Sequence, residues 1–161
     1  MRSEQEINSA IDRYADTVRR LCVLHLKNSA DTEDIFQTVF LKYALHAKPF
    51  ESEEHEKAWF IRVTINACKD LLRSFFRSRT VPLDQVLEQP DDCPVERRDV
   101  LEAVLALEPK YRQVVYLHYY EGYTAPQIGA ILGRNVNTVY TLLTRARRML
   151  KQTLGEDEDE E

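Results

Sequence analysis

The chain has 161 residues, enough for one domain or two small ones, and it contains neither an apolar run long enough to span a membrane nor a signal peptide. Its formal net charge is −5, but residues 156–161 are all acidic, and without them 22 basic residues stand against 21 acidic ones. The three cysteines are far apart, with no pair at metal-ligand spacing. We therefore expect a cytoplasmic protein with no membrane insertion and no metal.

The N-terminal part is predicted to begin with two helices. Apolar residues recur at helical spacing, and strand signals are almost absent. Ser3 and Glu6 form the pattern of a capping box, which predicts a first helix to about His25. Residues 28–31 break the pattern, and a second helix should follow to about His46. The spacing thus indicates an all-α fold.

A third helix carries the most informative charge pattern of this half. Lys48–His55 is predicted to be a polar loop, and the helix should run from Lys57 to about Arg77. Along it, polar and basic residues form one stripe at spacings of four, three, four and four: Arg62, Asn66, Lys69, Arg73 and Arg77. A charged face is usually only solvated, but if the other half of the chain binds DNA, this stripe indicates a second DNA contact.

The composition changes between residues 81 and 94. This stretch has three prolines, few apolar residues and an acidic cluster, which predicts a flexible linker. Helices resume near Val95. We therefore expect two small helical domains, residues 1–80 and 95–155, joined by this linker and followed by an acidic tail at 156–161.

The second domain contains a predicted helix-turn-helix. Thr124 caps its first helix and Gln127 completes a capping box, while Gly133 permits the turn and Asn135 caps the second helix. The buried faces are predicted to hold Ile128, Ile131 and Leu132 in the first helix and Val139, Leu143, Ala146 and Leu150 in the second. This arrangement is typical of a DNA-binding module.

The exposed face of the second helix carries hydroxyl and guanidinium groups at helical spacing: Thr138, Thr141, Arg145 and Arg148. Such groups suit base edges and phosphates in a major groove. Between residues 109 and 155, seven basic residues accompany Glu121 alone. The alternative is a solvated basic helix in another kind of bundle, and the short glycine turn favours DNA binding. The acidic tail either shields this module from non-specific DNA or only keeps the protein in solution.

Three segments match a family pattern in the correct order: Thr32–Tyr43, Trp59–Arg73 and Asn137–Arg147. They resemble, respectively, the polymerase-gripping helix, the −10 promoter segment and the −35 recognition helix of bacterial RNA polymerase sigma factors of the extracytoplasmic-function group. Trp59 could serve as a wedge that melts DNA, but its place at the start of an amphipathic helix favours a core anchor.

The resemblance implies roles for matching residues. Polymerase binding would involve Asp34, Gln37 and Phe40. The −10 element would be contacted by Arg62, Asn66, Lys69 and Arg73, and the loop 48–56 would form the wall of a pocket for a flipped base. The −35 element would be contacted by Arg134, Asn137, Thr138, Tyr140, Thr141, Arg145 and Arg148.

The sequence departs from the family near the −35 helix. The family often has glycine at the position of Asn137, lysine at Tyr140 and arginine at Leu142. Either backbone affinity at the −35 element is weaker, or another residue supplies it.

The resemblance implies a factor that binds core RNA polymerase, directs it to promoter DNA and promotes opening, with an anti-sigma factor as a further partner. We expect no cofactor and no enzymatic activity, because the four histidines are scattered and no phosphate loop or nucleophile motif occurs. The alternative is a stand-alone helix-turn-helix regulator that binds duplex DNA as a dimer.

Overall fold

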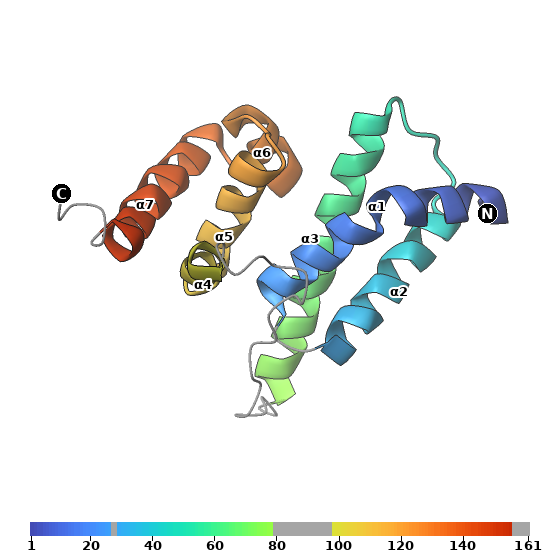
Figure 1. Cartoon of the computed structure of the whole chain (residues 1–161). Coiled ribbons are helices and arrows are strands. Elements are labelled where there is room, and N and C mark those ends of the chain that lie inside the picture. The colour runs from blue at the N-terminus through green and yellow to red at the C-terminus, as the bar shows by residue number, and fades with distance from the viewer. Residues whose placement is uncertain (27–28, 79–97, 156–161) are drawn as a thin grey trace. The chain divides into compact units, whose positions relative to one another are not determined.

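The structure, a computed structural model, describes residues 1–26, 29–78 and 98–155, and within these ranges every regular element is helical (Figure 1). The chain divides into two compact units, Met1–Gln89 and Pro90–Glu161. The predicted all-α fold with two helical domains is confirmed. The described residues do not include the predicted linker at 81–94 with Cys93, the acidic tail or the side chain of Arg77. The exact domain limits therefore stay predictions.

The first unit is a bundle of three helices, α1 (Glu4–His25), α2 (Ser29–Leu45) and α3 (Glu53–Ser78), each of which packs against the other two (Figure 1). The fully buried ring of Phe60 on α3 is the centre of their core. It stacks on Tyr14 of α1 at 4.7 Å between ring centroids and lies 5.0–5.2 Å from Tyr43 and Phe40 of α2. These aromatic contacts fix the orientation of α3, whose opposite face carries the basic stripe.

Two further core residues are the cysteines Cys22 and Cys68, which are free and buried. A hydrogen bond to Cys22, together with burial, raises the pKa of the Cys68 thiol. The thiol therefore stays protonated and acts as a small packing group.

The predicted start of α1 is confirmed, because the Ser3 hydroxyl accepts a hydrogen bond from the Glu6 amide at 3.2 Å. The start of α2 was predicted too late, since the helix begins at Ser29, within the stretch expected to break the pattern.

The start of α3 was also predicted too late, by about one helical turn. The helix begins at Glu53 rather than Lys57, so residues 53–55 are not part of a loop. The Ser52 hydroxyl accepts a hydrogen bond from the His55 amide at 3.1 Å, and the first turn contains three glutamates. A hydroxyl cap and acidic side chains both stabilise the positive end of a helix.

The second unit consists of α4 (Arg98–Leu105), α5 (Pro109–Val115), a π-helical turn η2 (Tyr116–Tyr120), α6 (Ala125–Leu132) and α7 (Val136–Leu154). Helices α4, α5 and α6 all pack against α7 (Figure 1). The fully buried side chains of this unit are mainly aliphatic: Val114, Leu117, Ile128, Val139 and Leu143. The other face of α7 is thereby left to the solvent.

Helices α6 and α7 form the predicted helix-turn-helix. Thr124 and Gln127 make the complete capping box, with bonds of 2.9 and 3.3 Å. Gly133 ends α6 with a φ of 67°, a left-handed conformation that favours glycine, and Asn135 caps α7 by accepting a bond from the Asn137 amide at 2.8 Å. These caps set the direction in which α7 leaves the turn.

Candidate nucleic-acid interface

The exposed face of α7 is the candidate −35 interface. Thr138, Thr141, Arg145 and Arg148 are all exposed, as the helical spacing predicts. A shallow depression on this face is lined by Tyr140, Thr141, Thr144, Arg145 and Arg148. The helix therefore offers hydroxyl, aromatic and guanidinium groups on one side, which are the groups that contact bases and phosphates.

The electrostatics of this face favour an anionic ligand. Helix α7 contains four basic residues and no acidic residue. Within the ranges that the structure describes, neither Arg145 nor Arg148 forms an ion pair. Arg147 lies on the neighbouring side, with its guanidinium carbon 5.8 Å from the centre of the Tyr119 ring. Guanidinium groups without carboxylate partners are available for phosphate oxygens.

The remaining predicted −35 residues lie at the start of α7 and in the turn. Asn137 is exposed in the first turn, and its carbonyl accepts the Thr141 hydroxyl at 3.0 Å. Arg134 is half-buried in the turn, and its amide donates to the Gly129 carbonyl at 2.9 Å. The structure thus brings all seven predicted −35 residues to one helix and its preceding turn.

The two positions at which the family often has a basic residue, Tyr140 and Leu142, have different structural settings. Tyr140 is 54% exposed and lines the depression, whereas Leu142 is 5% exposed and packs in the core. A leucine at a core position contributes apolar burial, so its lack of charge has a packing reason. Sequence reasoning did not include Leu142 in the buried stripe, although it stands next to Leu143 and four residues before Ala146.

The candidate −10 interface is the polar stripe of α3. Arg62, Asn66 and Arg73 are exposed, and Lys69 is half-buried. Arg73 is 3.9 Å from the Asp70 carboxylate, an exposed pair of low stabilising value. The opposite side of α3 holds the buried residues Phe60, Ile61, Ile65 and Cys68. The core therefore turns the stripe toward the solvent.

The loop between α2 and α3, residues 46–52, contains an aromatic anchor that was missed in the sequence. The half-buried Phe50 ring lies 5.7 Å from Trp59, 5.1 Å from His46 and 6.3 Å from Tyr43. Trp59 is half-buried in the same cluster, which favours the core-anchor interpretation. The sequence does offer one signal for this anchor, because Phe50 is the single phenylalanine in the otherwise polar segment 48–55.

The carboxylate of Glu56 connects this cluster to α1. It accepts a hydrogen bond from the Tyr43 hydroxyl at 3.3 Å and lies 3.6 Å from the Arg13 guanidinium. Burial, with the nearby Glu56 charge, raises the pKa of Tyr43, so its hydroxyl stays protonated and continues to donate.

The predicted polymerase-binding residues on α2 fall into two groups. Asp34 and Gln37 are exposed, but Phe40 is 6% exposed and lies in the core, 4.7 Å from Phe36. The Phe40 ring is therefore not part of the surface, because the packing of α2 against α1 and α3 covers it. Two leucines that sequence reasoning missed, Leu41 and Leu45, are 61% and 63% exposed. They continue the Asp34–Gln37 stripe at spacings of four.

In the described part of the chain, no helix is long and apolar enough to cross a membrane. Among the same residues, no three histidine, cysteine or acidic side chains lie close enough together to hold a metal ion.

The chain is similar to known proteins over both units. Residues 10–79 match the family model described as Sigma-70 region 2, and residues 97–150 match the model described as Sigma-70, region 4. The RNA polymerase sigma factor CarQ of Myxococcus xanthus is 29% identical over 150 residues, which cover 89% of this chain and 86% of CarQ. The ECF RNA polymerase sigma factor SigW of Bacillus subtilis is 27% identical over a match that covers 89% of this chain and 86% of SigW.

The fold is also found in solved structures. The sigma factor RpoE of Bartonella quintana, in complex with the anti-sigma factor NepR, aligns with a TM-score of 0.77 at 20% identity, covering 94% of this chain and 98% of that one. CnrH, in complex with the cytosolic domain of CnrY, aligns with a TM-score of 0.69 at 21% identity, and the match covers 96% of this chain and 91% of CnrH. The two family models together span most of the chain, in the order region 2 then region 4. The chain therefore belongs to the sigma-70 family of RNA polymerase sigma factors, in its extracytoplasmic-function group.

Proposed function

We propose that this protein is a transcription initiation factor that binds core RNA polymerase, directs it to promoters and assists DNA opening. The observation that carries this function is the match to region 2 and region 4 on two separate helical units. Each unit also presents an exposed polar and basic helix face. The factor itself breaks no covalent bond and acts in the cytoplasm, where the polymerase meets the chromosome.

In the proposed mechanism, α7 enters the major groove of the −35 element. Thr138 and Thr141 face base edges from the first turns of the helix, and Arg145 and Arg148 reach phosphates. Tyr140 stands where the family often has lysine. Its exposed ring can contact a thymine methyl group or a sugar, so apolar contact replaces charge at this position.

The −10 element is proposed to bind along α3 after its strands separate. Asn66 offers both an amide donor and an acceptor to the edge of an unstacked base, and Lys69 and Arg73 hold the adjacent backbone. Flipping a base costs a few kcal/mol, so the site must supply contacts that the duplex cannot. The loop 46–52 and the start of α3 form the proposed wall of this pocket.

Core polymerase is proposed to contact α2. The exposed stripe of Asp34, Gln37, Leu41 and Leu45 combines polar groups with apolar area, as protein interfaces do. Phe40 supports this stripe from the core rather than contacting the partner itself.

The free factor is proposed to bind duplex DNA weakly, and core polymerase to hold its two units at the spacing of the promoter elements. Two modest contacts then act together through effective concentration. The solved structures of RpoE and CnrH each contain a bound partner protein, and the partner of RpoE is the anti-sigma factor NepR. By this likeness we propose that an anti-sigma factor covers the same surfaces here.

The alternative, a stand-alone regulator that binds duplex DNA as a dimer, is not favoured, because residues 10–79 match region 2. The test is to measure DNA affinity of the purified protein with and without core RNA polymerase, together with its mass in solution. A sigma factor should co-elute with the core enzyme and bind promoter fragments specifically only in that complex. A dimer that binds palindromic duplexes tightly by itself would overturn the proposal.

A further inference from the structure

Arg2 makes an unusual set of contacts at the start of the loop 46–52. Its backbone amide donates to the Ala44 carbonyl at 2.9 Å, and its guanidinium donates to the Lys48 carbonyl at 2.9 Å. The same guanidinium pairs with Glu6 at 3.2 Å. Only 14% of the side chain is exposed. The N-terminal segment is thereby fastened to the end of α2, where the loop begins.

The guanidinium also lies over two rings that support the loop. Its central carbon is 4.5 Å from the centroid of Tyr43 and 5.1 Å from that of Phe50. One planar cation thus contacts the last turn of α2, a loop carbonyl and the loop's aromatic anchor. Arginine is suited to this combination, because it can stack through its face and donate through its edge.

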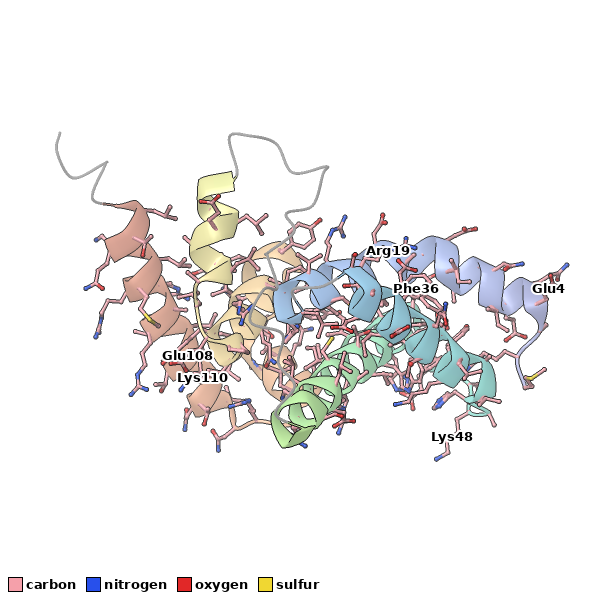
Figure 2. The ribbon with its side chains drawn as sticks, turned by 90° about the horizontal axis from the view of Figure 1, so that it is seen from below. Glu4, Arg19, Phe36, Lys48, Glu108 and Lys110 are labelled. Atoms are coloured by element: carbon pink, nitrogen blue, oxygen red, sulfur yellow. The ribbon has the colours of Figure 1, made fainter. Side chains whose placement is uncertain are left out.

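The rest of the loop has few other attachments. Lys48, Pro49, Glu51 and Ser52 are exposed, and the Lys48 side chain projects away from the helices (Figure 2). The Glu51 amide donates to His55 at 3.2 Å at the far end of the loop. Between that bond and α2, the Arg2 contacts and the packing of Phe50 fix the path of the backbone.

We propose that Arg2 is a positioning residue for promoter opening: it holds the loop 46–52 in the shape that receives the unstacked −10 strand. This inference rests on the proposed function of the loop, and adds a residue outside α3 on which strand capture depends. Arg2 acts through the loop and does not itself contact DNA.

The test compares the wild-type protein with the variants Arg2→Ala, Arg2→Lys and Arg19→Ala. Arg19 is the matched control, since it is also an arginine at the N-terminal helix over an aromatic ring, 4.4 Å from Phe36, but it is joined to α2 away from the loop (Figure 2). Loop position is measured by hydrogen exchange of the His46 and Glu51 amides and by acrylamide quenching of Trp59, the sole tryptophan. Strand capture is measured in holoenzyme by permanganate reactivity of unpaired −10 thymines.

We expect Arg2→Ala to speed exchange of the loop amides and to lower open-complex formation, each by roughly five- to tenfold, with polymerase binding unchanged. Arg2→Lys should change loop exchange and open-complex formation in the same directions but by less, and it serves as the test if the alanine variant unfolds the domain. Arg19→Ala should leave loop exchange and opening as in the wild type. Unchanged loop exchange and quenching in both Arg2 variants would overturn the inference, as would a displaced loop with normal opening. Failure of the proposed function is distinguishable, because the wild-type holoenzyme would then open no promoter.

Discussion

Gly129 on α6 lies close to the backbone of the turn that precedes α7. A Cβ atom at this position would be 2.8 Å from the backbone oxygen of Arg134, closer than real Cβ atoms come to other atoms. The Arg134 amide also donates to the Gly129 carbonyl at 2.9 Å. Alanine at 129 would therefore force the turn away from α6 and lengthen this hydrogen bond.

The expected effect of Gly129→Ala follows from opposing contributions. Alanine in a helix interior is ordinarily favoured over glycine by about 1 kcal/mol. Overpacking against a rigid backbone typically costs about 1–3 kcal/mol, and weakening a hydrogen bond adds about 0.5–1.5 kcal/mol. We expect the clash to dominate, so that the free energy of unfolding of the C-terminal unit falls by about 1–2 kcal/mol.

Urea denaturation can separate the two units. Trp59 fluorescence follows the N-terminal unit and should be unchanged, while hydrogen exchange of α6 and α7 amides reports the C-terminal unit. Ala130→Gly is the matched control, because Ala130 is exposed on the same helix and its replacement should cost about 1 kcal/mol through helix propensity alone. A Gly129→Ala protein as stable as the wild type, or more stable, would refute the close-packing argument.

Three further predictions concern the proposed interfaces. Arg145→Ala should lower −35-dependent transcription roughly tenfold and reduce the salt dependence of DNA binding by about one phosphate contact. Binding to core RNA polymerase should stay intact, and its loss in a pull-down would contradict this prediction. Asn66→Ala should reduce open-complex formation roughly tenfold, measured by permanganate footprinting, while −35 docking persists; an equal loss of both would count against the −10 role. Asp34→Arg reverses a charge on the exposed stripe of α2 and should abolish co-purification with core polymerase. Normal co-purification would remove Asp34 from the proposed polymerase surface.

The helix-turn-helix was predictable because its determinants are local. The Thr124–Gln127 box, the left-handed Gly133 and the Asn135 cap each depend on residues within a few positions, and all are found in the structure. The helical spacing also placed Thr141 and Arg145 correctly on the exposed face of α7.

Features that depend on tertiary packing were harder to predict. Phe40 shares a helix with the exposed Asp34 and Gln37, but its burial depends on where α1 and α3 pack against α2. The contact between Arg2 and the Lys48 carbonyl joins residues 46 positions apart, which no local pattern indicates.

The boundary of α3 was misjudged for a local reason. In the sequence, the acidic run after Ser52 has the composition of a solvated loop, whereas acidic residues in a first turn stabilise a helix. The burial of Leu142 was also not predicted. The comparison with the family pattern drew attention to its missing charge, although Leu143 next to it and the nearby Ala146 already indicated a buried face.

The most direct test of the central claim is transcription by core RNA polymerase on genomic fragments, with and without this protein, followed by sequencing of the transcript 5′ ends. We predict discrete start sites that require the protein and share two upstream elements at a fixed spacing, near −35 and −10. Transcripts that are the same in both reactions, together with no binding to core polymerase, would contradict the assignment of this chain as a promoter-directing factor.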